Sequence, residues 1–177
     1  MNPLLLPVGA MTLVVVASNW LVQYPINDVL TWGAITYPFS FLITDLTTRL
    51  QGPQRARTVV WIGFALAVLL SAWLATPRIA LASGTAFLAG QLLDIQVFQR
   101  LRAGSWWRAP LVSSTLGSVV DTLLFFSLAF AGTDLPWHTL AAGDLGVKLL
   151  LAVLALAPFR AVLALALPVT PRPPAGI

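Results

Sequence analysis

The sequence predicts an all-α integral membrane protein with six transmembrane helices, and three observations lead to this prediction. Of the 177 residues, 58% are hydrophobic and only 9% are charged, whereas about a quarter of a soluble domain is charged. All six acidic residues are Asp, although soluble helical proteins place Glu freely on exposed helix faces. Apolar stretches of roughly 20 residues, the length that crosses a bilayer, follow one another along the chain.

These stretches predict one transmembrane domain over residues 1–167 and a Pro-rich, disordered cytoplasmic tail over residues 168–177. The first stretch has no basic segment before it, so we interpret it as a retained helix and not as a signal peptide. With six helices, the two halves run in opposite directions, and an inverted 3+3 repeat is compatible with that arrangement. The expected spans are 4–23, 29–48, 58–75, 79–98, 110–131 and 145–167.

Span one, at 4–23, contains amides near its outer end. Asn19 and Gln23 are four residues apart and therefore lie on one helix face. Such amides hold membrane helices together or contact a ligand, and the sequence alone leaves both interpretations open.

Span two, at 29–48, contains a proline in its middle. Pro38 removes a backbone donor and is expected to kink the helix, leaving free carbonyls that could face a cavity. Asp45 and Arg49 are spaced for an i, i+4 ion pair, so we expect both to be structural.

Span four, at 79–98, places Gln91 and Asp94 within a membrane-spanning length. One Asp at a helix centre costs about 2.5 to 3.5 kcal/mol to insert, so an intramembrane acid indicates a functional site. Asp94 continues a stripe of small residues at four-residue spacing that ends at Gly90, and small residues let another helix approach closely. The acid is therefore expected to point into the bundle.

Span five, at 110–131, repeats this pattern with Ser113, Gly117 and Asp121. Because both stripes combine small residues with an acid, we expect spans four and five to form an antiparallel hairpin around a polar centre.

Span six, at 145–167, contains Lys148 near its outer end and Pro158 further along. Lys148 could extend to the membrane surface, neutralise an acid or contact a ligand, and Pro158 is expected to kink the helix. Arg160 is expected to reach the opposite surface or to pair with an acid.

Charges in the expected loops orient the chain. Acids dominate the loops on one side, where Arg78 is the single arginine, so the positive-inside rule places the opposite loops and both termini in the cytoplasm. The basic loops contain Arg49, Arg55 and Arg57 after span two, and Arg100, Arg102 and Arg108 after span four.

Composition also narrows the function classes. Without Cys, the sequence has no disulfide, thiolate metal site or Cys nucleophile. The single His138 falls in an expected loop, and no HExxH, Walker A or GxGxxG pattern occurs. We therefore expect no metal, no cofactor and no catalytic residue. The net charge of +4 comes from loop arginines and does not indicate nucleic-acid binding.

Several long ordered motifs resemble the queuosine precursor transporter family, also called the VUT family. They are SNWLVQYP, TWGAITYPFSFLITDLTTRLQG, ASGTAFLAGQLLDIQVFQRLR and WWRAPLVSSTLGSVVDTLLFFSLAF, and the likeness weakens after Phe130 and resumes over 144–158. The short loop at 76–78 departs from the family, whose members often carry more residues there.

The resemblance implies a bacterial inner-membrane importer of 7-cyano-7-deazaguanine, with its aminomethyl relative as a second candidate substrate; these bases are salvaged to make the tRNA nucleoside queuosine. Carboxylates can accept from the ring N–H and exocyclic amine of such a base, amides can serve its carbonyl, and aromatic rings can stack on it. The candidate substrate-binding residues are Asn19, Gln23, Tyr37, Phe39, Phe41, Gln91, Asp94, Asp121 and Lys148.

The expected mechanism is alternating access around a polar cavity near the membrane midplane. The expected partners are the 7-deazaguanine substrate and the lipid bilayer, and a homodimer is compatible with the sequence. Two alternatives stay open. One is a substrate-capture subunit of an ATP-driven vitamin importer, and the other is an intramembrane hydrolase in which Asp94 and Asp121 face each other.

Overall fold

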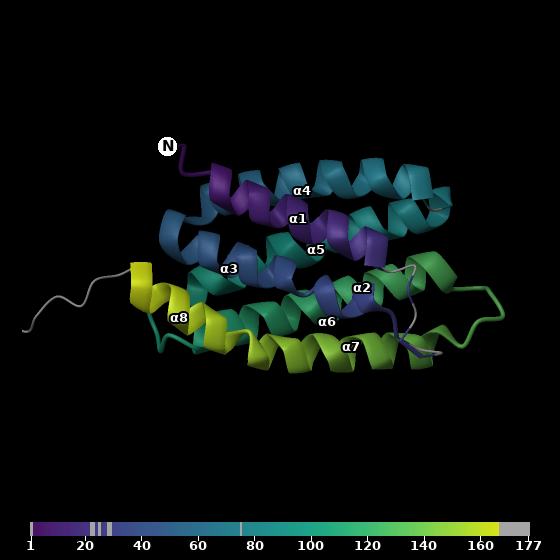
Figure 1. Cartoon of the computed structure of the whole chain (residues 1–177). Helices are drawn as coiled ribbons and strands as arrows, with labels where there is room; N and C mark the ends of the chain where they lie inside the picture. Colours follow the sequence, from purple (N-terminus) through teal and green to yellow (C-terminus); the bar gives the residue numbers. More distant parts are fainter. Residues whose placement is uncertain (1, 22–23, 25, 28–29, 75, 167–177) are drawn as a thin grey trace, which may run out of the picture.

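The computed structural model describes residues 2–21, 24, 26–27, 30–74 and 76–166, and every regular element within these ranges is a helix. The predicted tail lies outside the described residues. The helices run side by side along one direction (Figure 1). They are α1 (Leu5–Leu21), α2 (Trp32–Thr36), α3 (Phe39–Gln51), α4 (Pro53–Leu74), α5 (Pro77–Leu101), α6 (Arg108–Phe130), α7 (Trp137–Leu154) and α8 (Leu156–Ala166).

Proline, glycine and threonine set several helix ends. Gly52, at a φ of 92°, turns the chain after α3, and Pro53 then starts α4. Thr76 caps α5 by accepting a hydrogen bond from the Ile79 amide, and Pro77 follows at the first helical position, where its missing N–H costs nothing. Gly132, at a φ of 79°, turns the chain after α6. Both glycines occupy left-handed conformations that other residues disfavour.

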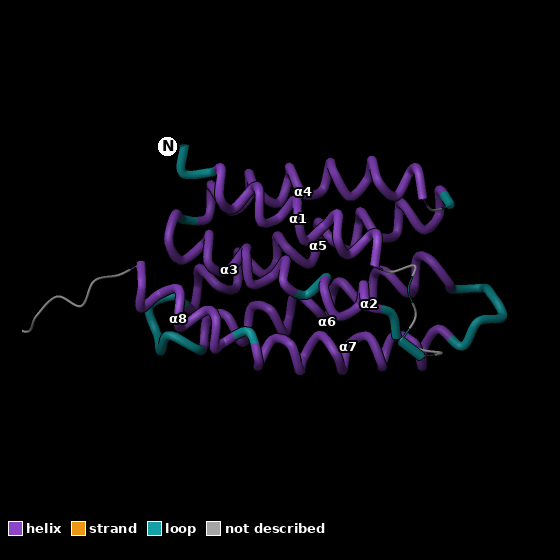
Figure 2. The backbone as a smooth tube through the Cα atoms, viewed as in Figure 1, coloured by secondary structure: helices purple, strands orange, loops and turns teal. Residues whose placement is uncertain are grey.

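Two of the predicted spans are interrupted helices. The second span breaks into α2 and α3 at Pro38, and the last breaks into α7 and α8 at Ala155, three residues before Pro158 (Figure 2). Each proline lacks the N–H that would bond to the carbonyl four residues earlier. Both predicted kinks are thus confirmed.

The last span begins earlier than the sequence suggested. Helix α7 starts at Trp137 and not at residue 145, so His138 and Asp144 belong to the helix and not to a loop. Pro136 and the polar residues that follow it, His138, Thr139 and Asp144, are typical of a loop, yet they lie at or within the first turns of α7. Lys148 consequently lies deep within α7 and not one turn from its end.

The arginine-rich helix ends meet at one end of the bundle. The start of α1, the α3–α4 turn, the α5–α6 turn and the end of α8 all lie there (Figure 1). Arg49 Nη1 donates to the Arg102 carbonyl at 2.7 Å, which ties α3 to the end of α5. Arg160 does not pair with an acid in the structure but lies over the Trp106 ring, 5.2 Å from its centroid.

Arg78, the arginine at the opposite end, has a structural role. Its side chain donates to the carbonyls of Leu128 at 2.9 Å and Ala131 at 2.6 Å. These carbonyls end α6 and have no intrahelical partner, so a cation there is favourable.

The bundle buries polar and charged side chains beside two hydrophobic clusters and exposes large apolar side chains, as suits a lipid environment. Asp45, Gln91, Asp94, Asp121 and Lys148 are buried, while many large apolar side chains on the outer faces are exposed. Within the part of the chain that the structure describes, three helical stretches are long and apolar enough to cross a membrane, namely Pro77–Leu101, Arg108–Phe130 and Trp137–Ala166. The count of six spans stays a prediction. So does the inverted repeat.

Candidate functional site

Helix α6 packs antiparallel to the segment that runs from Tyr37 into α3, and polar side chains contact each other at two places along this interface. Near one end of this contact, the Tyr37 hydroxyl donates to Asp121 Oδ1 at 2.7 Å. Near the other end, the Ser113 hydroxyl donates to Asp45 Oδ1 at 2.9 Å. Eight residues separate the two contacts on each helix, so two distinct polar clusters lie along one interface.

An apolar contact separates the two clusters. Phe41 is 2% exposed and packs on Gly117, where an added Cβ would lie 2.7 Å from the Phe41 ring. Gly90 of α5 meets the same point, because a Cβ there would lie 3.0 Å from both the Gly117 carbonyl and the Asp121 Cβ. These distances are too short for any side chain larger than Gly. The predicted close hairpin of α5 and α6 is therefore confirmed.

We call the first group the lysine cluster; it consists of Tyr37, Asp121, Thr122, Asp144 and Lys148. Lys148 Nζ lies 2.7 Å from Asp121 Oδ2, 2.5 Å from Asp144 Oδ2 and 3.0 Å from the Thr122 hydroxyl. The Thr122 hydroxyl donates to Asp144 at 2.8 Å, and Lys148 also lies 5.3 Å from the centroid of the Tyr37 ring. The contacts of Lys148 with Asp121 and Asp144 are the only ion pairs in the described part of the chain. One cation thus serves two acids, with hydroxyl donors on both.

We call the second group the carboxyl pair, Asp45 and Asp94. Asp45 accepts from the hydroxyls of Ser113 and Ser114, each at 2.9 Å. Asp94 is fully buried, and neither of its oxygens accepts a hydrogen bond from any residue that the structure describes. The two carboxyl groups interact electrostatically with each other. This cluster therefore contains two acids and no cation.

Gln91 belongs to a third, self-contained contact. Its Oε1 accepts from the Thr44 hydroxyl at 2.6 Å, and its Nε2 donates to the Ser40 hydroxyl at 2.9 Å. Both ends of the amide are therefore bound to α3. This arrangement fits the role of Gln91 in joining α3 to α5.

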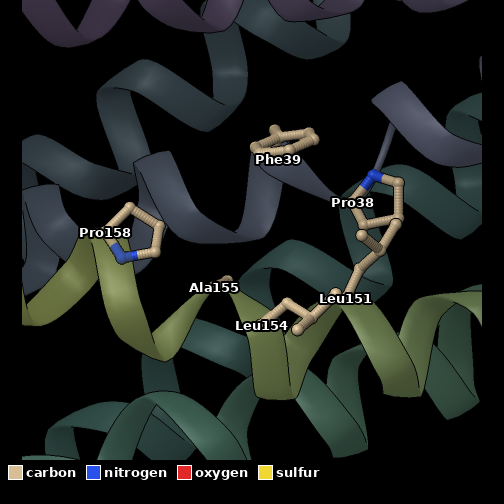
Figure 3. A pocket seen from close by; sticks show the side chains of 6 residues that line it. All are labelled: Pro38, Phe39, Leu151, Leu154, Ala155 and Pro158. Atoms are coloured by element: carbon tan, nitrogen blue, oxygen red, sulfur yellow. The ribbon is translucent and has the colours of Figure 1, made fainter.

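An apolar groove lies between the two interruptions of the helices. It has a volume of about 260 Å³ and separates the start of α3 from the junction of α7 and α8 (Figure 3). Its lining residues are Pro38, Phe39, Leu151, Leu154, Ala155 and Pro158.

A small cavity of about 10 Å³ adjoins this groove, with which it shares Pro38, Leu151 and Ala155. Polar groups enter its wall, because Lys148, Ser114 and Ser118 line it. Phe41, Leu42 and Ala152 complete the lining. The cavity therefore contacts Lys148 of the lysine cluster and Ser114, the residue that donates a hydrogen bond to Asp45. In this conformation it is large enough for about one water molecule.

The structure brings together only some of the residues that the sequence suggested for a ligand site. Tyr37, Asp121 and Lys148 meet in the lysine cluster, Phe41 lines the small cavity, and Phe39, 42% exposed, lines the groove. Asn19 donates to the carbonyl of Val15 in its own helix at 2.9 Å. Gln23 lies outside the described residues.

The predicted pairing of Asp45 with Arg49 is wrong, and the facing arrangement of Asp94 and Asp121 that the hydrolase alternative needs does not form. Asp45 does not pair with Arg49, because Asp45 faces the serine hydroxyls of α6 while Arg49 extends to the end of α5. Asp94 does not face Asp121, because Asp121 turns toward Tyr37 and Lys148 while Asp94 turns toward Asp45.

Sequence reasoning missed Asp144, Thr122 and Ser114. Asp144 and Lys148 are spaced for an i, i+4 ion pair, and this signal was available. We overlooked it because we placed Asp144 in a loop. No sequence signal distinguished Ser114 from the other serines of the bundle.

Comparison with known proteins identifies the family to which the sequence is similar. The sequence matches the model of the putative vitamin uptake transporter family over residues 31–76 and 71–163. It is 37% identical over 180 residues to a queuosine precursor transporter of Escherichia coli (strain K12), covering 85% of this chain and 81% of that protein. It is 35% identical over 186 residues to a probable queuosine precursor transporter of Haemophilus influenzae, covering 82% and 79%.

A more distant relative, a probable queuosine precursor transporter of Bacillus subtilis (strain 168), is 27% identical over 130 residues and covers 58% of this chain and 57% of its own length. No solved structure matches the chain.

Proposed function

The chain belongs to the putative vitamin uptake transporter family, and from this premise we propose that it is a membrane transporter of queuosine precursors. Its substrate is a 7-deazaguanine base, 7-cyano-7-deazaguanine in the first place and its aminomethyl relative in the second. The protein works in the bacterial inner membrane with six spans and both termini in the cytoplasm. The arginine-rich end of the bundle supports this orientation.

One observation carries the proposal: a buried cation paired with an acid lies beside a cavity between two interrupted helices. Lys148 lines the cavity and holds Asp121 at 2.7 Å. A guanine-like edge presents a carbonyl acceptor next to two N–H donors. An ammonium beside a carboxylate complements that edge, because Lys148 can donate to the carbonyl while Asp121 accepts from the N–H groups.

Aromatic side chains supply the remaining recognition. Tyr37 belongs to the lysine cluster, Phe41 lines the cavity, and Phe39 lines the groove. Their rings offer faces on which a planar base can stack. Asn19 donates within its own helix, Gln91 is bound to α3 at both ends of its amide, and Asp94 turns toward Asp45, so the proposal assigns them no contact with the base.

Access to this site requires opening, because a cavity of about 10 Å³ is too small for a base. The groove and the cavity share Pro38 and Ala155, the points where the two helices break. Movement at these breaks would join the two spaces into one. Interrupted helices around a central site are a recurrent feature of alternating-access transporters.

The test is uptake of radiolabelled 7-cyano-7-deazaguanine by proteoliposomes that contain this chain alone. We expect saturable uptake without ATP that unlabelled base inhibits. Protein-free vesicles are the control. Binding of the base without uptake would instead favour a substrate-capture subunit, since such a subunit needs partner proteins to move its ligand. Cleavage of a peptide substrate without uptake would favour the hydrolase alternative.

A further inference from the structure

We propose that Asp45 and Asp94 form a proton-binding site, in which the two buried carboxyl groups share one proton that crosses the membrane with the substrate. This inference rests on the proposed transport function and deepens it, because it names the ion that drives uptake. The site lies on three helices, with Asp45 on α3, Asp94 on α5 and the serine donors on α6.

The first argument concerns charge. Asp94 is 0% exposed and Asp45 is 2% exposed. Neither acid forms an ion pair with any residue that the structure describes. Two ionised carboxylates cannot remain together in such surroundings without a cation. A proton on one of them removes half of the charge and lets the protonated group donate to the other.

Neighbouring cations do not supply the missing charge. Lys148 is bound to the acids of its own cluster, and Arg49 donates to the Arg102 carbonyl. Arg78 of α5 lies at the opposite end of the bundle and donates to the carbonyls of Leu128 and Ala131. The remaining arginines on the neighbouring helices lie toward the arginine-rich end with exposed or half-buried side chains, and they are Arg55, Arg57, Arg100, Arg102, Arg108 and Arg160. Asp121, the single acid of α6, is held by Tyr37 and Lys148.

The second argument concerns hydrogen bonds. Both oxygens of Asp45 accept from serine hydroxyls, whereas neither oxygen of Asp94 has a donor among the described residues. A buried acceptor without a donor is costly, and native structures rarely leave one. A proton between the two carboxyl groups gives Asp94 the hydrogen bond that it lacks. The hydrogen bonds from the serine hydroxyls stabilise Asp45 as an anion. The same arrangement does not suit the coordination of a metal ion by Asp45.

The third argument connects the pair to the transport site. Ser114 donates to Asp45 and also lines the small cavity next to Lys148. Opening of the cavity between α3, α6 and α7 would therefore hydrate Ser114 and give protons a route to the pair. Closure buries both carboxyl groups again, and that step requires a bound proton. The pair takes up the proton from the outer side and releases it on the inner side. The only covalent change is an O–H bond that forms on uptake and breaks on release.

The experiment uses proteoliposomes containing the full chain and labelled 7-cyano-7-deazaguanine. We expect an acidic exterior to accelerate uptake severalfold in the parent. In Asp94→Asn, which imitates a permanently protonated group, the response to the pH gradient should vanish, while exchange of labelled for unlabelled base persists. Asp134→Asn, at an exposed acid outside the bundle, is the matched control and should respond like the parent.

The outcomes separate this inference from the transport proposal. A parent that shows neither uptake nor exchange contradicts the transport function itself. A parent that exchanges base but ignores the pH gradient, or follows a sodium gradient instead, overturns the proton site alone. If Asp94→Asn does not fold, infrared spectroscopy of the parent decides the question. A protonated carboxyl absorption in the parent that shifts in deuterium oxide, because the site exchanges its proton with water, supports the site, and its absence overturns it.

Discussion

The lysine cluster and the carboxyl pair occupy the same interface of α6, yet they differ in their charge balance. In the lysine cluster, one buried ammonium contacts two carboxylates, and the hydroxyls of Tyr37 and Thr122 donate to them. In the carboxyl pair, two acids meet without any cation, and one of them has no hydrogen-bond donor among the described residues. The first cluster is complete as it stands, and the second requires an additional positive charge.

This difference separates two tasks that a transporter must perform. A cluster with fixed donors and acceptors can recognise a neutral base without taking up a charge. A cluster that is short of one charge suits a mobile ion. Phe41, seated on Gly117, separates the two, so that each cluster can change state while α6 connects them.

The largest expected effect comes from removing the cation of the lysine cluster. Lys148→Met leaves the buried Asp121 and the partly exposed Asp144 without their partner, and breaking a buried pair costs about 3 to 5 kcal/mol. We expect a strongly reduced melting temperature and folded yield in detergent. Adding Asp121→Asn to the variant should recover part of the loss. Unchanged stability of the single variant would mean that the cluster does not balance charge.

The donors to the carboxyl pair provide a second, smaller test. Ser114→Ala removes one of the two donors to Asp45, and losing a hydrogen bond to a charged group costs about 1.5 to 3 kcal/mol. Thr122→Val is the matched control in the lysine cluster, where Lys148 still serves both acids. Thermal unfolding of the two variants should show the larger loss for Ser114→Ala. Equal losses would remove the distinction between the clusters.

The smallest expected effect concerns the contact that separates the clusters. Gly117→Ala places a methyl group 2.7 Å from the Phe41 ring and 3.0 Å from the Gly90 carbonyl, and such overpacking costs about 1 to 3 kcal/mol. At Gly143 an added Cβ meets no atom within 4 Å, so Gly143→Ala should leave the melting temperature unchanged or slightly raised. If the two variants melt alike, the close approach of α5 and α6 is not important for stability.

Much of this arrangement could be predicted from residue spacing. The stripes that lead to Asp94 and Asp121 predicted the α5–α6 hairpin, because small residues at four-residue intervals mark a close helix contact. Pro38 and Pro158 predicted the two interruptions, because proline removes a backbone donor wherever it stands. These signals are local, and they depend little on how the helices are rotated against each other.

The partners of the buried acids could not be predicted in the same way. Whether Asp94 faces Asp45 or Asp121 depends on the rotation of three helices, which no single stripe determines. For Asp45, the local Arg49 was a reasonable partner, but two serines on α6 lie closer to its carboxyl group. The pairing of Lys148 with Asp121 was one of several open interpretations, and only the packing of α7 against α6 selects it.

The most direct test of the different roles of the two clusters is calorimetric binding of 7-cyano-7-deazaguanine to purified Asp94→Asn and Asp121→Asn. We expect Asp94→Asn to bind the base about as tightly as the parent, because the carboxyl pair binds the proton. Asp121→Asn should bind it at least tenfold more weakly, a loss of about 1.4 kcal/mol or more, because this acid accepts from the N–H groups of the base. Parent-like binding by Asp121→Asn together with lost binding by Asp94→Asn would contradict this assignment and place the base at the carboxyl pair.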